Sequence, residues 1–242
     1  MHFSIQEELF NVLPDLTIGI VVGMDVNNSR PVKEIDDLLT QAIEEMKRNF
    51  IGEKAQEHPR IKPWRTAFSK LAISGSKFPS SVESMAKRIL KGDPIPRINP
   101  LVDLYNSVSL RYLVPMGGHD LDTVKGDIYL RFAEGWEPFT PLGGGDTTIV
   151  PKGELIYRDD QEVLTRNWVW RQCEKDKGTE KTRNVFIPID VLGEVGRERA
   201  HEVIGELSHL IPRHLGGSIF SAILNIKNPS VEIPYPPVIK MP

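Results

Sequence analysis

A histidine and an aspartate stand side by side within residues 115–120, which read PMGGHD. Imidazole has an ordinary pKa near neutral pH, so His119 can act as a general base or orient an attacking water. Asp120 is the candidate for holding the imidazole in place. Three residues ahead of this pair can form the wall of a pocket, since glycine lets the backbone approach a ligand closely: Met116, Gly117 and Gly118. From these residues alone, the corner is either a catalytic turn or a glycine-rich connection between a helix and a sheet.

A second candidate wall is the sequence RNWVWRQ at residues 166–172. Read as a strand, it puts Arg166, Trp168 and Trp170 on one face and Arg171 on the other. Tryptophan and arginine stack on aromatic rings and nucleobases, and arginine also binds phosphate or carboxylate. The alternative is ordinary packing of the two tryptophans between the sheet and a helix.

Other reactive side chains form no comparable pattern. His201, His209 and His214 lie near one predicted helix without an i,i+4 pair, so we expect no metal site. The single cysteine, Cys173, follows a predicted strand and is expected to serve packing rather than catalysis. The segment PLGGGDTT resembles a phosphate-binding loop only in its glycine content, and we interpret it as a turn. We expect no cofactor.

Charge is unevenly distributed along the chain. The formal net charge is −3, but residues 59–100 carry nine lysines and arginines against Glu83 and Asp93. A local positive field of this kind attracts a polyanion such as a nucleic acid even to an acidic protein. The candidate contacts are Arg60, Lys62, Arg65, Lys87, Arg88 and Arg97. The alternative is a set of solvated helix faces without a partner.

Hydrophobic spacing predicts the elements that position these residues. An apolar, β-branched run at residues 15–26 predicts a buried strand, and helical spacing follows over residues 32–50. Further helices are predicted at 63–73, from Ser80 or Ser81 to before 92, at 100–113 and at 197–215. Short strands are predicted at 126–132, 153–159, 162–170 and 183–192. The proline-rich end, 228–242, predicts extended chain or an edge strand.

Helices that precede a series of strands favour an α+β fold. The 242 residues are 40% hydrophobic and 26% charged, which is enough for a core in one large domain or two small ones. No apolar run approaches the roughly 20 residues that span a bilayer, and the acidic N-terminus lacks the pattern of a signal peptide. We expect a cytoplasmic protein without a membrane partner, and the sequence makes no prediction of its oligomeric state.

A joint pattern of motifs runs from residue 98 to residue 192: VDLYN in a helix, the PMGGHD turn, the strand GDIYLRF, and TRNVFIPIDVL. Together these motifs resemble the B3/B4 editing domain of the phenylalanyl-tRNA synthetase β subunit. The matching positions in the helix, the turn and the strand are Val102, Asp103, Asn106, Pro115, Met116, Asp120, Gly126, Ile128 and Arg131.

The resemblance implies a B3/B4-like antiparallel or mixed sheet flanked by helices, within the α+β class. It assigns residues 98–242 to this domain and leaves residues 1–97 as an N-terminal extension of a strand and basic helices, packed on the core. We expect a free-standing member of the group rather than a complete phenylalanine–tRNA ligase.

The resemblance also implies a function, since that family's domain hydrolyses a wrongly attached amino acid from tRNA. We expect a trans-acting aminoacyl-tRNA deacylase that binds aminoacylated tRNA through the basic region. Gly117 stands where the family has its editing-site histidine, His119 where it has phenylalanine, and Pro188 where it has glutamate. The expected substrate-binding residues are Asn106, Met116, Gly117, Gly118, Arg131, Arg166, Trp168, Trp170 and Arg171.

One alternative is a non-catalytic module that binds an amino acid, a nucleotide or RNA in the same pocket. Another is a hydrolase or isomerase of a small metabolite.

Overall fold

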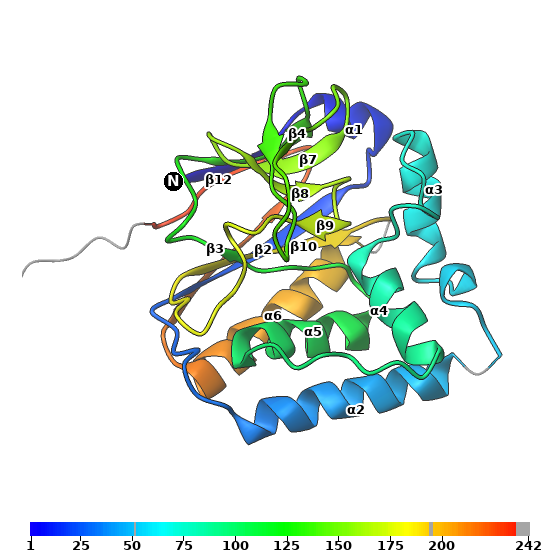
Figure 1. The fold of residues 1–242 in the computed structure, drawn as a ribbon, viewed down its shortest axis with the longest axis vertical. Coiled ribbons are helices and arrows are strands. Elements are labelled where there is room, and N and C mark those ends of the chain that lie inside the picture. Colours follow the sequence, from blue (N-terminus) through cyan, green and yellow to red (C-terminus); the bar gives the residue numbers. More distant parts are fainter. Residues whose placement is uncertain (51, 194–195, 236–242) are drawn as a thin grey trace, which may run out of the picture.

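Two sheets and a layer of helices are stacked in the computed structural model, which describes residues 1–50, 52–193 and 196–235 (Figure 1). The strands are β1 His2–Ile5, β2 Thr17–Met24, β3 His119–Asp120, β4 Ile128–Phe132, β5 Pro138–Phe139, β6 Thr148–Ile149, β7 Leu155–Arg158, β8 Val163–Arg166, β9 Arg171–Gln172, β10 Val185–Val191, β11 Ser218–Leu224 and β12 Ser230–Glu232. The helices are α1 Glu8–Val12, α2 Lys33–Asn49, η1 Ala55–Glu57, α3 Lys62–Lys70, α4 Ser81–Leu90, α5 Pro100–Tyr112 and α6 Gly196–Leu215. The predicted α+β class is confirmed.

The first sheet has the order β12-β1-β4-β7-β8-β9 and is mixed, because β1 runs parallel to β4 and antiparallel to β12. The second sheet has the order β11-β2-β10-β3 and is antiparallel. Strand β2 is central because its sequence TIGIVVGM is apolar on both faces. Ile18, Ile20 and Val22 face the first sheet, whereas Val21 faces the helices.

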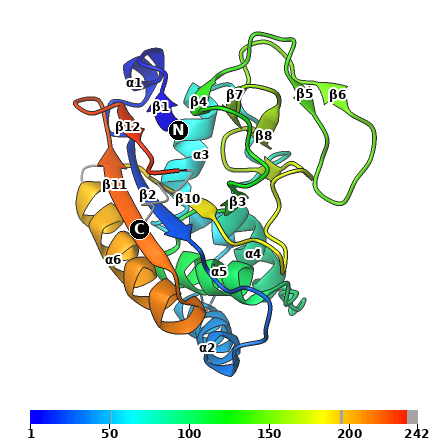
Figure 2. The same ribbon diagram turned by 90° about the vertical axis from the view of Figure 1, so that its left-hand side faces the viewer.

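Helices α5 and α6 cover the other face of the second sheet, and α2 packs against α5 (Figure 2). Helix α2 forms where predicted, because Ile35, Leu39, Ala42 and Met46 repeat at helical spacing and are all buried. No helix among the described residues combines the length and the apolarity that crossing a membrane requires.

Capping residues fix the two helices nearest the candidate site. Ser80 accepts a hydrogen bond from the Glu83 backbone N–H at 3.4 Å, so α4 begins at the predicted serine pair. Asn99 caps α5 by accepting from the Val102 N–H at 3.0 Å. Leu113 then ends α5 in a left-handed conformation (φ 54°) and turns the chain toward the PMGGHD corner.

The structure corrects one predicted strand and describes only part of another. The strand predicted over residues 162–170 is wrong beyond Arg166, where a turn at residues 167–170 separates β8 from β9. The predicted edge strand at the C-terminal end is present as β12, while residues 236–242 of that prediction lie outside the described residues.

The N-terminal residues supply strands to both sheets. Within the first sheet β1 pairs with β4 and β12, and within the second β2 pairs with β10 and β11. Residues 1–97 are therefore joined to residues 98–242 by backbone hydrogen bonds, and the domain boundary after residue 97 stays a prediction.

Candidate functional site

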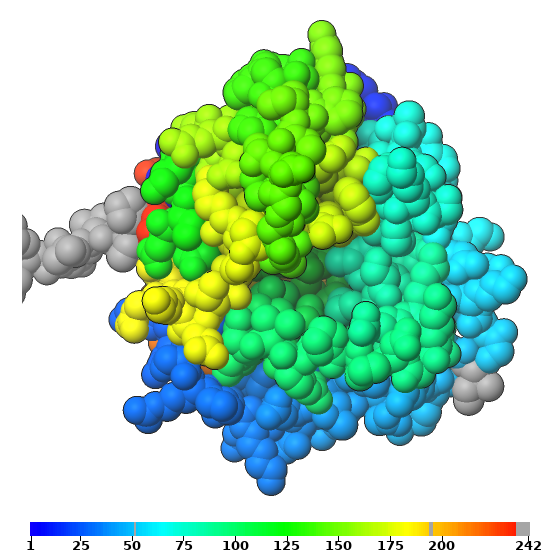
Figure 3. All heavy atoms as spheres, viewed as in Figure 1, coloured from blue at the N-terminus to red at the C-terminus, as the bar shows by residue number. Residues whose placement is uncertain are grey.

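The PMGGHD corner and the tryptophan-bearing segment line one pocket of about 300 Å³. From the corner come Met116, Gly117 and His119; from the segment at residues 166–172 come Trp168, Trp170 and Arg171, among other residues. The surface is hollowed where the loop between β5 and β6 reaches toward α4 and α5 (Figure 3). Six of the candidate residues thus share one hollow, between the two sheets and the helices.

His119 is held by a buried aspartate. Its Nδ1 contacts Asp176 Oδ2, and both side chains are almost completely buried. Asp176 Oδ1 accepts hydrogen bonds from Gln172 Nε2 at 3.0 Å and from Cys173 Sγ at 3.2 Å, so the carboxylate is itself fixed. Because Nδ1 is engaged, Nε2 is the imidazole nitrogen left for a water or a ligand.

Asp120 does not orient His119. Neighbouring residues on a strand point to opposite faces, and the two residues form β3. Asp120 instead accepts hydrogen bonds from Thr182 Oγ1 at 2.6 Å and from the Asp122 N–H at 3.1 Å, and burial raises its pKa. The carboxylate that orients the imidazole of His119 is therefore that of Asp176, a residue for which no local pattern in the sequence suggested this role.

A second buried acid, Asp190 on β10, lines the pocket and was missed by the sequence interpretation. Its Oδ1 accepts hydrogen bonds from Tyr157 Oη and from Trp168 Nε1, each at 2.7 Å. Burial raises the pKa of the Asp190 carboxyl to about 6, although these two hydrogen bonds and the charge of His119 lower it in part. The signal in the sequence was a lone acid in the apolar strand VFIPIDV.

The two tryptophans do not share a strand face, because they lie in the turn between β8 and β9. Trp168 has a left-handed backbone (φ 63°) and 0% exposure, and its ring packs on Trp64 at 4.8 Å and Phe68 at 6.2 Å between centroids. Trp170 packs edge-on against Phe78 at 4.6 Å. Trp168 is therefore a wall of the pocket and no free stacking platform.

Two of the three candidate arginines are committed to structural ion pairs. Arg166 binds Glu154 through Nε at 2.8 Å and Nη2 at 2.6 Å. Arg131 binds the buried Glu137 at 2.7 Å. Neither is among the residues that line the pocket, and their contact with substrate stays a prediction. Arg171 is exposed at the mouth of the pocket, where its Nη2 donates to the Leu142 carbonyl at 3.0 Å.

Asn106 and Gly118 lie outside the lining of the pocket. Gly118 has a structural reason to be glycine, since a Cβ there would meet Tyr105 Cε1 at 2.7 Å. Its carbonyl accepts from Gln172 Nε2 at 2.8 Å, which joins the corner to β9. Gly117 has open space around it on the pocket side.

The basic region is partly used inside the fold. Arg65 and Lys87 both bind Glu83, whose side chain is completely buried. Burial by itself would raise the pKa of Glu83, but the hydrogen bonds from these two cations leave it lowered. Arg88 donates to the Pro94 carbonyl at 2.6 Å and Arg97 to Thr40 Oγ1 at 2.7 Å. Arg65 and Lys87 therefore have a structural role in the fold, and their contact with tRNA stays a prediction.

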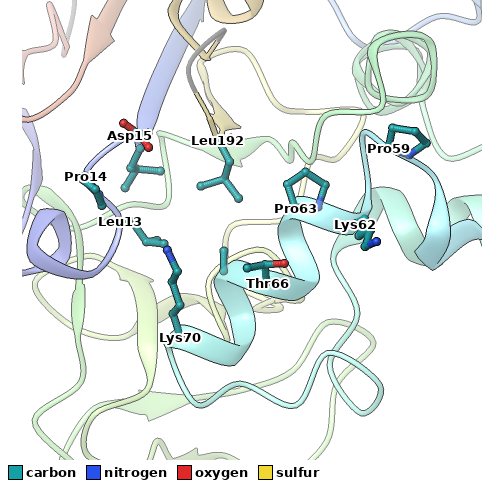
Figure 4. A pocket seen from close by; sticks show the side chains of 11 residues that line it. Leu13, Pro14, Asp15, Pro59, Lys62, Pro63, Thr66, Lys70 and Leu192 are labelled. Atoms are coloured by element: carbon teal, nitrogen blue, oxygen red, sulfur yellow. The ribbon is translucent and has the colours of Figure 1, made fainter.

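A larger hollow, of about 400 Å³, lies elsewhere, along α3 (Figure 4). Lys70 extends from α3 toward Leu13, and Lys62 lies at the other end of the lining. Asp15 is the one acid in its lining, Thr66 adds a hydroxyl, and the other residues besides the two lysines are apolar. This hollow is larger than the pocket of His119 but contains no group suited to proton transfer near neutral pH.

Metal and thiol chemistry find little support in the described part of the chain. No three histidine, cysteine or acidic side chains within residues 1–50, 52–193 and 196–235 gather as metal ligands. The thiol of Cys173 is buried, and burial raises its pKa, so the nucleophilic thiolate is disfavoured.

These features define an α+β protein with a ligand-sized pocket between two sheets and a layer of helices. The sequence matches the B3/4 domain over residues 64–224, about two thirds of the chain. The protein therefore belongs to the B3/4 domain family, and the predicted resemblance is confirmed.

Relatives with curated names are phenylalanine–tRNA ligase β subunits. The chain is 34% identical over 92 residues to that of Fusobacterium nucleatum and 32% identical over 119 residues to that of Pectobacterium atrosepticum. These matches cover 38% and 48% of this chain, but only 11% and 15% of the two relatives. A solved N-terminal fragment of the phenylalanyl-tRNA synthetase β-subunit from Pyrococcus horikoshii gives a TM-score of 0.43 at 14% identity, covering 91% of this chain and 53% of that one.

Proposed function

We propose that the protein is a cytoplasmic, trans-acting aminoacyl-tRNA deacylase. The observation that carries the proposal is the buried His119–Asp176 pair inside a 300 Å³ pocket of a B3/4 domain. A pocket of this size is at the lower end for small-molecule sites and suits an aminoacyl group better than a whole nucleotide.

The proposed reaction is hydrolysis of the ester between an amino acid and the terminal ribose. A water held by His119 Nε2 attacks the ester carbonyl, and the imidazole accepts the proton of that water. The bond from the carbonyl carbon to the ribose oxygen then breaks, and the proton passes to that oxygen. Asp176 holds the imidazole and stabilises its protonated form.

The outer surface supports a nucleic-acid partner. Arg171 lies at the pocket mouth, and Arg60, Lys62 and Arg88 belong to the region of dense positive charge. Phosphate contacts by such side chains make affinity fall steeply with salt. We expect tRNA binding to weaken by at least about tenfold between 50 and 200 mM salt, measured by gel shift.

The decisive experiment is incubation of the protein with a panel of mischarged tRNAs. Ester loss above the uncatalysed rate for at least one pair supports the proposal, and no loss for any pair removes it. His119→Ala should lower the rate by about 10²–10⁴-fold. His209→Ala is the matched control, since His209 is an exposed histidine of α6 remote in sequence from the pocket.

A second candidate function is non-catalytic binding of an amino acid in the same pocket. Gly117 and Pro188 favour it, because both line the pocket without a polar side chain where the resembled family carries histidine and glutamate. A thermal-shift screen with free amino acids distinguishes the two. Stabilisation by an amino acid without any ester hydrolysis favours binding alone.

A further inference from the structure

The inner end of the pocket is made by side chains with almost no exposure. Tyr157, Trp168 and Asp190 are each exposed by 1% or less, whereas Arg171 and Leu142 at the mouth are exposed. Phe186, Pro188 and Asp190 alternate on one face of β10, so Asp190 points away from the helix layer. A carboxyl group thus stands at the most enclosed part of the site.

Among the described residues the carboxyl of Asp190 forms no ion pair, unlike the four acids with 0% exposure; the buried Asp103 and Asp120 form none either, but neither lines this pocket. The four acids with 0% exposure each contact a cation or a histidine: Glu83 contacts Arg65 and Lys87, Glu137 contacts Arg131, Asp159 contacts Lys175, and Asp176 contacts His119. Asp190 has only the two neutral donors Tyr157 and Trp168, both on Oδ1. Oδ2 has no donor within the residues that the structure describes.

A buried charge is costly unless it is paired, so an unpaired carboxylate on a pocket wall calls for a cation from the ligand. The indole of Trp168 and the phenol ring of Tyr157 line the same end, and aromatic rings also attract an ammonium group. A tRNA is far too large to enter a pocket of 300 Å³, so its ester end must face the mouth. The part of the ligand that reaches Asp190 is then the end of the amino-acid side chain.

We propose that Asp190 binds a terminal ammonium group, so that the site takes aminoacyl groups with an unbranched, amine-ended side chain. The claim that the ligand is an aminoacyl ester rests on the proposed function, whereas binding of the ammonium group by Asp190 does not. Asp190 acts as a specificity-determining residue, and His119 keeps the proton-transfer role.

The first test compares esters on one tRNA: lysyl, norleucyl, Nα-acetyl-lysyl and Nε-acetyl-lysyl. A hydrogen bond to a charged group corresponds to about 10–100-fold, so the lysyl ester should be hydrolysed that much faster than the norleucyl ester. Acetylation at Nε should remove the advantage, and acetylation at Nα should leave it. A preference for norleucine, or a loss only on Nα acetylation, overturns the proposal.

Asp190→Asn should lower the lysyl rate more than the norleucyl rate, so that the ratio of the two rates falls to about one. Asp37→Asn, at an exposed position of α2, is the matched control and should keep the preference. An equal loss for both esters in Asp190→Asn would mean that Asp190 supports the site without selecting the side chain, which overturns the proposal.

A binding measurement separates this inference from the proposed hydrolysis. Calorimetry with lysine amide and norleucine amide requires no reaction. If no ester is hydrolysed, the deacylase proposal fails; tighter binding of lysine amide that Asp190→Asn removes still supports the amine site. Equal binding of the two amides overturns the amine site, whatever the hydrolysis experiment gives.

Discussion

Replacing Asp190 by asparagine should stabilise the fold at neutral and alkaline pH. The amide oxygen keeps the acceptor for Tyr157 and Trp168, so the two hydrogen bonds at 2.7 Å persist. The change replaces the carboxylate by a neutral amide and so removes the negative charge, which forms no ion pair among the described residues and is compensated only in part by the charge of His119. When a residue is kept for ligand binding at a cost to the stability of the fold, its substitution is expected to stabilise the protein.

The magnitude follows from the pKa of Asp190, which is about 6 in the fold against 3.8 for an ordinary aspartate. Below pH 3.8 the carboxyl is protonated in both the folded and the unfolded chain, so the fold carries no penalty. As pH rises from about 4 to 6, the unfolded chain loses the proton first and the free energy of unfolding falls. Above pH 6 the full loss applies, and this pKa difference corresponds to about 3 kcal/mol.

Urea denaturation at pH 4, 5, 6, 7 and 8 measures this effect as the difference in unfolding free energy between variant and wild type. The difference should be close to zero at pH 4 and reach at most about 3 kcal/mol in favour of Asp190→Asn at pH 7–8. Asp37→Asn, on the exposed face of α2, should show no such trend. A difference that does not change with pH, or a less stable variant at pH 8, would refute the reasoning.

Three further outcomes are expected. Arg65→Ala should lower the free energy of unfolding by about 1.5–3 kcal/mol in urea, because the buried Glu83 loses its hydrogen bonds from Arg65 and keeps only Lys87; a change in tRNA affinity alone would contradict this. Gly118→Ala should cost about 1–3 kcal/mol through its contact at 2.7 Å, whereas Gly117→Ala should cost little, and equal costs would disprove the steric argument. Because burial raises its pKa, the Cys173 thiol should resist alkylation in the native protein and react in urea; rapid native labelling, followed by mass spectrometry, would count against it.

Helices α2 to α6 were predictable because each carries its own local signal, whereas the short α1 and η1 were not predicted. Helix α2 shows a full apolar face, α4 begins at a capping serine and α5 begins at an asparagine followed by proline. Strand β2 was predictable from a long β-branched run. Strand β11 was not predicted, since its pattern is only half buried and it is fixed by pairing with β2.

The site was predictable only where its residues are neighbours in sequence. The PMGGHD corner marked His119, but its partner Asp176 lies 57 positions later and reaches it through folding of the segment after β9. Asp190 could be noticed as an acid in an apolar strand, yet its role depends on Tyr157 and Trp168 from two other segments. The tryptophans were misplaced because a tight turn with left-handed residues leaves little trace in a β-rich sequence.

Strands β1 and β2 lie inside their sheets, although they are the first strands of the chain to be synthesised. During translation β2 emerges with both edges open, and its neighbours β10 and β11 follow only after about 160 and 200 further residues. Contacts so distant in sequence slow folding, and an apolar strand with open edges invites pairing with other nascent chains. The ribosome-bound protein therefore passes most of its synthesis without either completed sheet, and a chain that ends before residue 218 is expected to depend on chaperones or to aggregate.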